Sequence, residues 1–138
     1  MLREHPFFRE LIMLGLPADG YVIAGSGAMF AHGLRKEIGD VDVVAGRIVW
    51  GMALKLGQPE PAPLGYVQRI VLFGGAIEVL DGWFGHPVDS LILEAETIEG
   101  INFMPLKRVL EWKIRFREGG MDRKKDARDI ELLEEYLR

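Results

Sequence analysis

The first half of the chain alternates between helical and strand-like spacing of its apolar residues. Phe7, Leu11 and Leu14 recur as on one face of a helix, whereas two later runs are short, apolar and rich in β-branched residues. The turn Gly25-Ser26-Gly27 directly follows the first of these runs. This spacing predicts helices over residues 6–16, 28–34 and 47–56 and strands over residues 21–24 and 41–45.

The second half of the chain contains two pairs of strand-like runs followed by two helical segments. Gly74-Gly75 lies between two apolar runs and is a strong hairpin signal, and Glu99-Gly100 marks a weaker one. Pro105 and Gly119-Gly120 fit the residue preferences of helix starts and ends. The Pro-rich stretch 58–63 is interpreted as a surface loop. The expected elements are strands over residues 67–73, 76–80, 95–98 and 101–104 and helices over residues 105–118 and 123–137.

The order of these elements excludes a regular alternation of strands and helices. A hairpin takes the place of a third strand-helix-strand unit, so the sheet must contain both parallel and antiparallel pairs. We predict an α/β (α+β) fold in which helices flank a mixed β-sheet and the chain closes with a helix pair. A length of 138 residues is that of one domain, here 1–138.

Composition narrows the chemistry that any site can perform. The chain has no Cys and only three scattered His, so we expect a metal to bind through oxygen. With 17 basic against 21 acidic residues the net charge is −4, and the mildly basic C-terminal segment is too weak a signal for nucleic-acid binding. No apolar run approaches the roughly 18 residues of a membrane span, and no signal peptide is visible. We therefore expect a cytoplasmic protein without membrane contact.

Asp40 and Asp42 bracket Val41 at the start of a predicted strand. Side chains alternate along a strand, so both carboxylates should point to one face. Two neighbouring anions repel unless a cation lies between them, and carboxylate oxygens suit Mg²⁺ or Mn²⁺. In the alternative interpretation, Asp40 is only a turn residue.

The turn around Gly25 and Ser26 adds a second feature to this site. A strand that runs into a Gly-rich turn and a helix presents free backbone N–H groups, which can hold a phosphate. No Gly-Lys-Ser/Thr follows, so the turn is not a P-loop. A dinucleotide site is a weaker interpretation, because Phe30 stands where its third glycine belongs and Asp42 opens its strand where the ribose-binding acid should end it.

A third acid and a buried lysine complete the candidate residues. Glu78 lies inside an apolar strand-like run, where a lone charge is hard to explain by packing, and we favour it over Asp81 as a third metal ligand. Lys113 falls on the apolar stripe of its helix, and Asp126 starts the stripe of the next helix. These two either pair with each other or belong to the site.

A recognisable pattern runs through most of these positions. It consists of Gly25-Ser26, Asp40-x-Asp42, Glu78, Lys113 and Arg123-Lys124-Lys125-Asp126-x-x-Asp129. The pattern resembles that of the nucleotidyltransferase superfamily of the DNA polymerase β type, and within it the small bacterial AbiEii-like toxins and lincosamide nucleotidyltransferases. The resemblance covers about residues 20–135.

This resemblance implies a nucleotidyltransferase-like fold and Mg²⁺-dependent transfer of a nucleoside monophosphate from an NTP to an acceptor. It implies that Asp40 and Asp42 hold the metal, with Glu78 as a third ligand or as the base, and that Gly25, Ser26, Lys113 and Asp126 contact the nucleotide. The acceptor, which can be a tRNA, a protein or a small molecule, is not identified; it is expected at an exposed groove or at a second subunit, in a homodimer or with a partner protein. The alternative is an inactive nucleotide- or protein-binding module on the same fold, such as part of a toxin-antitoxin pair.

Overall fold

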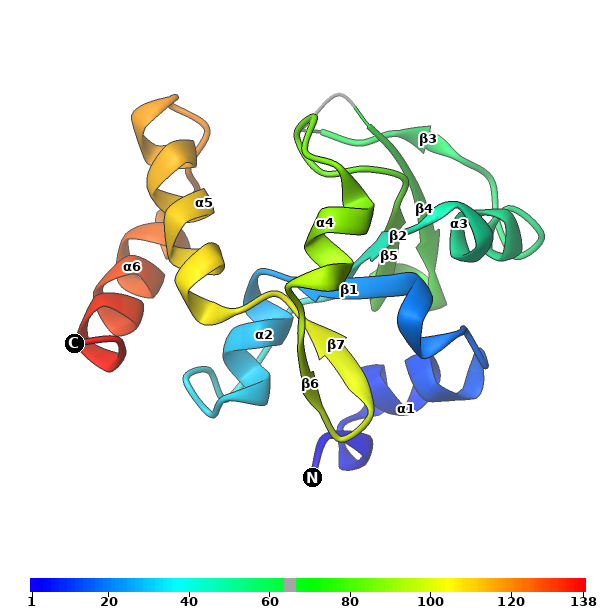
Figure 1. The fold of residues 1–138 in the computed structure, drawn as a ribbon, viewed down its shortest axis with the longest axis horizontal. Helices are drawn as coiled ribbons and strands as arrows, with labels where there is room; N and C mark the ends of the chain where they lie inside the picture. The colour runs from blue at the N-terminus through cyan, green and yellow to red at the C-terminus, as the bar shows by residue number, and fades with distance from the viewer. Residues whose placement is uncertain (64–66) are drawn as a thin grey trace.

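The computed structural model describes residues 1–63 and 67–138. Within these ranges, seven strands form one mixed sheet in the order β3-β4-β5-β2-β1-β7-β6 (Figure 1). The strands are β1 (Tyr21–Ala24), β2 (Val41–Ala45), β3 (Glu60–Pro61), β4 (Gln68–Leu72), β5 (Ile77–Leu80), β6 (Glu96–Ile98) and β7 (Ile101–Phe103).

The centre of the sheet is β5-β2-β1, and its register positions the candidate site. β2 runs parallel to β5 and antiparallel to β1. Asp42 therefore lies opposite Glu78 on one side and opposite Ala24 on the other. The end of β1 and the starts of β2 and β5 meet at the same edge of the sheet.

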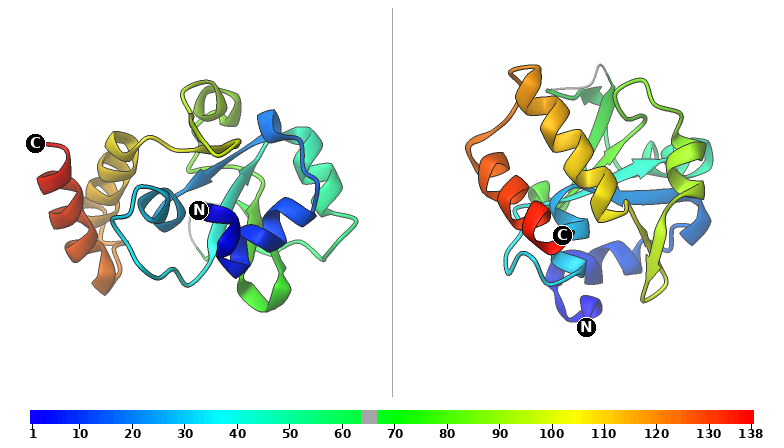
Figure 2. Two further views of the ribbon diagram at one scale, coloured as in Figure 1. Left: turned by 90° about the horizontal axis from the view of Figure 1, so that it is seen from below. Right: turned by 60° about the vertical axis from the view of Figure 1, so that its left-hand side comes forward.

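Six α-helices surround this sheet in the described ranges. α5 and α6 lie side by side at one end of the molecule with α2 between them and the strands, and α1 and α4 lie on opposite sides of the central strands (Figures 1 and 2). The helices are α1 (Pro6–Met13), α2 (Ser26–Ala31), α3 (Arg47–Ala53), α4 (Val88–Leu93), α5 (Leu106–Glu118) and α6 (Lys124–Tyr136), with short 3₁₀ helices η1 (Leu2–Glu4), η2 (Ala18–Gly20) and η3 (Phe73–Gly75). None of these helices is both long and apolar enough to cross a membrane.

The core lies between the helices and the central strands. All four residues of β1 are buried, because β1 has strands on both sides and helices over both faces. Phe8 of α1 stacks on Phe30 of α2 with ring centroids 5.8 Å apart and also contacts Phe103 of β7 at 5.9 Å. This packing joins α1 and α2 to the sheet.

The structure confirms the mixed sheet, the hairpin at Gly74-Gly75 and the C-terminal helix pair. The two glycines have φ of +65° and +104°, a conformation that glycine adopts without strain. The hairpin is thus closed by η3, whose positive φ angles explain why glycines occupy this turn.

Several predicted boundaries are wrong by a few residues. α1 ends at Met13, short of residue 16, because Gly15 takes a φ of +67° and stops the helix. α2 covers residues 26–31, so it begins earlier than predicted and places Ser26 in its first turn. α3 ends at Ala53, short of residue 56.

Two elements are absent from the sequence prediction. The stretch 58–63, predicted to be only a loop, contains the edge strand β3, whose Glu60 and Pro61 pair with β4. Helix α4 follows Pro87 and packs Val88, Leu91 and Ile92 against the core, a helical spacing that spans little more than one turn. It is a single short helix that becomes stable by packing against β1.

Candidate metal and nucleotide site

Three carboxylates from two neighbouring strands meet at the edge of the sheet where β1 ends. One oxygen atom from each of Asp40, Asp42 and Glu78 lies within 4.8 Å of the others. Alternation along β2 places Asp40 and Asp42 on one face, and the parallel register puts Glu78 on the same face beside Asp42. The predicted convergence of these three acids is confirmed.

Crowding and burial disfavour ionisation of these acids. Burial first, and then the neighbouring charges of Asp40 and Glu78, together raise the pKa of Asp42 to about 8, against the opposing effect of Arg123. The pKa of Asp40 is also raised, first by burial and then by Glu78, against the opposing effect of Lys125 and Arg123. The cluster therefore carries unfavourable negative charge, which a cation would relieve.

Arg69 is the only side chain that forms a salt bridge with the three acids in the described part of the chain. Its guanidinium donates to Glu78 and also to Glu60, with an Nε to Oε1 distance of 2.9 Å for the latter. Arg69 lies two residues from Val71, which faces Glu78 across the β4-β5 ladder, so the ion pair is a diagonal cross-strand contact.

The Gly-rich turn lies beside the acids because Ala24, the last residue of β1, pairs with Asp42. Gly25 adopts φ +60° and ψ −130°, a combination that side chains with a Cβ rarely reach, so the turn requires glycine. Ser26 is buried at the start of α2. A small hollow of about 40 Å³ joins Gly25 and Ser26 to Asp42, Lys113 and Arg123.

Lys113 and Asp126 contact each other directly. Lys113 Nζ lies 2.8 Å from Asp126 Oδ1 and 3.1 Å from Asp129 Oδ2, and all three side chains are buried between α5 and α6. Asp126 also accepts a hydrogen bond from the backbone N–H of Arg123 at 2.8 Å, and Arg35 reaches Asp129 at 3.3 Å. Burial would raise the pKa of Asp126, but the donors Arg123 and Lys113 outweigh burial and lower it. The pairing anticipated for Lys113 and Asp126 is therefore observed, at the rim of the hollow that contains Gly25.

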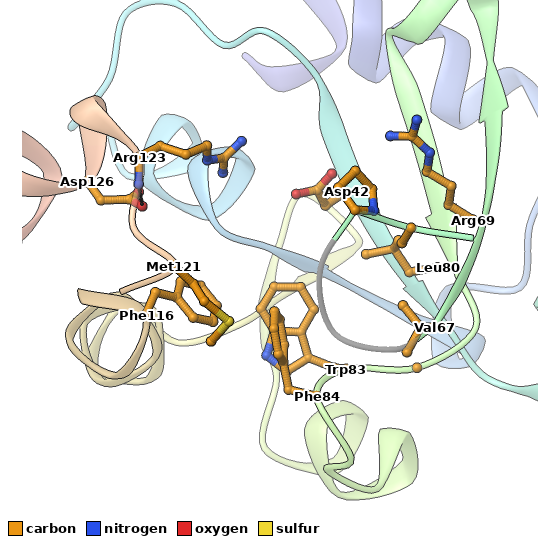
Figure 3. Close-up of a pocket in the computed structure, with 13 residues that line it drawn as sticks. Asp42, Val67, Arg69, Leu80, Trp83, Phe84, Phe116, Met121, Arg123 and Asp126 are labelled. Carbon is orange, nitrogen blue, oxygen red and sulfur yellow. Dashed lines mark hydrogen bonds between the residues drawn. The ribbon is translucent and has the colours of Figure 1, made fainter. Parts of the chain in front are cut away.

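Two further cations face the acids, and the sequence analysis did not single them out as site residues. Arg123 is exposed and extends from the start of α6 toward Asp42 (Figure 3). Burial lowers the pKa of Lys125, as do the nearby charges of Arg123 and Arg35, while Asp40 raises it. Both residues belong to the Arg-Lys-Lys-Asp segment of the quoted pattern, which was the available signal.

Asp81, the alternative third acid, lies outside the cluster. It is exposed just after β5, and its Oδ1 accepts a hydrogen bond from the backbone N–H of Gln68 at 2.9 Å. This contact helps to close the β4-β5 ladder, which accounts for an acid at that position without a metal.

A larger cavity of about 140 Å³ opens next to Asp42 (Figure 3). Its walls are mostly apolar and come from β4, β5, the segment after β5 and the turn between α5 and α6. The charged residues at its rim are Asp42, Arg69, Arg123 and Asp126. The site thus combines an acidic centre, cationic side chains and an apolar cavity.

Comparisons of this chain with protein-family models, with curated proteins and with solved structures found no match.

Proposed function

We propose that this protein is a metal-dependent nucleotidyltransferase, which moves a nucleoside monophosphate from an NTP to an acceptor. The observation that carries the proposal is the convergence of Asp40, Asp42 and Glu78 beside the Gly25-Ser26 turn. In the same proposal, the mixed sheet with its flanking helices is a nucleotidyltransferase-like fold of the small AbiEii-like type.

The three acids fit a divalent cation in number, chemistry and charge. Carboxylate oxygens are the ligands that Mg²⁺ and Mn²⁺ prefer. Three ionised acids with one paired arginine, Arg69, sum to −3 + 1 = −2. When bound, Mg²⁺ neutralises phosphate oxygens and the charge that develops at the reacting phosphorus.

The remaining residues have roles in positioning the nucleotide. Backbone N–H groups at Gly25 and Ser26 would bind the terminal phosphates. Arg123, which faces Asp42, adds a positive charge on the opposite side of the same hollow. Lys113 and Asp126 act on the nucleotide indirectly: their mutual ion pair holds the wall of this hollow in place and so orients the phosphates.

The reaction needs little covalent participation from the protein. An acceptor oxygen or nitrogen attacks the α-phosphorus, the bond from the α-phosphorus to the bridging oxygen breaks, and pyrophosphate leaves with the electron pair. Glu78 either completes the metal site or accepts the acceptor's proton. Asp40 and Asp42 would contribute by holding the cation, and the facing Arg123 and Lys125 would neutralise charge on the triphosphate while the reactants are positioned in line.

A second candidate is an inactive nucleotide- or protein-binding module. The observation that favours it is the ion pair between Arg69 and Glu78, which occupies the third acid. Such a module would bind an NTP without transferring it.

The experiment uses the full chain with each of the four α-labelled NTPs, Mg²⁺ and cell extract. We expect label on an acceptor with at least one NTP, and a loss of labelling of about 10³-fold in Asp42→Asn, which removes several kcal/mol of charge stabilisation. Asp81→Asn is the matched control, because it makes the same change outside the cluster, and should label normally. NTP binding without labelling by any of the four would support the second candidate.

A further inference from the structure

The cavity beside Asp42 adjoins the phosphate-binding hollow proposed above. The two share Asp42, Trp83, Phe116 and Arg123 as lining residues. Gly25, Ser26 and Lys113 line the hollow alone, whereas Leu80, Phe84 and Met121 line the cavity alone. The walls of the cavity are therefore the more apolar of the two.

Aromatic rings and a methionine form the apolar end of the cavity. Phe116 approaches from the last turn of α5 and Met121 from the α5-α6 turn, and Trp83 and Phe84 lie opposite them (Figure 3). The ring centroids of Phe84 and Phe116 are 4.8 Å apart, and those of Trp83 and Phe84 are 5.0 Å apart. Phe84 has φ +49°, an uncommon conformation for a bulky residue. Backbone strain of this kind clusters at ligand-binding positions.

The indole Nε1 of Trp83 is a buried donor without a hydrogen-bond partner in the described residues. The side chain is 8% exposed. Leaving a buried N–H unpaired is costly, so such groups usually find a partner. Because Trp83 lines both hollows, a small turn of the indole would bring this enclosed donor to an acceptor atom of a bound ligand.

We infer that this cavity binds the nucleobase of the NTP, an inference that rests on the proposed function. Phosphates at Gly25-Ser26 and the α-phosphate at Asp42 would direct the rest of the nucleotide toward the aromatic end. Every nucleobase offers a flat face for stacking and a ring nitrogen or carbonyl oxygen that can accept the Trp83 N–H. The cavity of about 140 Å³ holds several times the roughly 30 Å³ that a water molecule takes in the liquid, so it has room for a compact ring.

The first measurement compares the affinity of the wild-type chain for ATP, GTP, CTP and UTP with its affinity for inorganic tripolyphosphate. All five are measured by calorimetry in Mg²⁺. Tripolyphosphate reports the phosphate and metal contacts alone. At least one NTP should bind about tenfold more tightly than tripolyphosphate, because base stacking contributes at this level.

Two variants then remove the cavity wall without touching the acids. Met121→Ala alters a residue that is 39% exposed, so folding should be unaffected, and Phe116→Ala removes a ring. Both should lower NTP affinity about three- to tenfold, and Met121→Ala, which lies outside the hollow around Gly25, should leave tripolyphosphate affinity unchanged. Met13→Ala, at the exposed end of α1, is the matched control and should change neither. Trp83→Phe keeps an apolar ring but deletes the N–H, and should also weaken NTP binding about threefold, with its melting temperature measured alongside.

The outcomes separate this inference from the function on which it rests. Equal affinities for NTPs and tripolyphosphate in the wild type would overturn the nucleobase assignment while leaving nucleotidyl transfer intact. The nucleobase assignment would also be overturned if Met121→Ala and Phe116→Ala slowed labelling without changing NTP affinity. The cavity would then hold the acceptor. Failure of both ligands to bind, together with an absence of labelling, would overturn the proposed function and this inference with it.

Discussion

Two groups of half-buried or buried charged side chains lie close together in this protein, and they differ in net charge. Lys113 and Arg35 pair with Asp126 and Asp129 between the C-terminal helices, so this group sums to 2 − 2 = 0. Within the described ranges 1–63 and 67–138, the carboxylate cluster at β2 and β5 has only the Arg69 ion pair, and it carries −2 when ionised.

The difference separates a structural role from a ligand-binding one. Buried charges that are paired and hydrogen-bonded hold elements in one arrangement. Buried charges of one sign oppose folding and are retained where something else neutralises them. The helix cluster therefore positions α6, whereas the strand cluster is expected to respond to a cation.

The largest expected effect is at the balanced group. Lys113→Met leaves Asp126 and Asp129 buried without their main partner and should lower the free energy of unfolding by about 3–5 kcal/mol. Urea denaturation measures this, and the loss should be the same with and without Mg²⁺. Lys107→Met, at an exposed position of the same helix, should change stability by about 0.5 kcal/mol or less. If Lys113→Met lowered the free energy of unfolding by less than about 1 kcal/mol, the Lys113 ion pairs would not have the structural role assigned to them.

The unbalanced group should instead make the metal-free protein less stable as pH rises. The pKa of Asp42 is about 8 in the folded chain against an ordinary value of 3.8, so between these pH values the folded state binds a proton that the unfolded state has released. Stability should therefore fall by about 4 kcal/mol from pH 5 to pH 8, at about 1.4 kcal/mol for each pH unit, and then level off. Urea titrations in EDTA should show this decline, and a much flatter profile for Asp42→Asn. A rise in stability over that range would contradict the assignment.

Mg²⁺ should compete with that proton. Below pH 8, binding of the cation releases the proton of Asp42, so the apparent affinity should weaken about tenfold, or about 1.4 kcal/mol, for each unit of decreasing pH. Calorimetric titrations at pH 6, 7 and 8 measure this. Asp81→Asn should keep the dependence, because Asp81 lies outside the cluster, and Glu78→Gln should weaken binding at every pH. A Mg²⁺ affinity that is insensitive to pH would place the binding elsewhere.

The smallest expected effect is at Arg69. Arg69→Met removes the one cation paired with the acids and should destabilise the metal-free protein by about 1 kcal/mol. Mg²⁺ should recover most of this loss, because it neutralises the same carboxylates. Thermal unfolding with and without Mg²⁺ tests the prediction, and a loss that Mg²⁺ leaves unchanged would show that Arg69 acts through packing alone.

Much of the central fold was predictable because its signals are local. The apolar run of β2, the hairpin glycines and the terminal residues of α5 each depend on a few neighbouring positions. The short elements β3 and α4 were missed, because β3 is only two residues long and α4 gains its stability from packing against β1, which is distant in sequence. The same applies to the aromatic cavity, where Trp83 and Phe116 come together from segments more than thirty residues apart.

The sequence by itself determined which residue types stand out: two acids on one face of a strand, a third acid in an apolar run, a glycine turn and a lysine on a buried stripe. Alternation along strands and helical periodicity are properties of the local backbone, so they can be read without tertiary contacts. Only the tertiary structure decided that Glu78 pairs in register with Asp42 and that Lys113 meets both Asp126 and Asp129. Register and helix docking are set by how the whole core packs, and no local pattern encodes that choice.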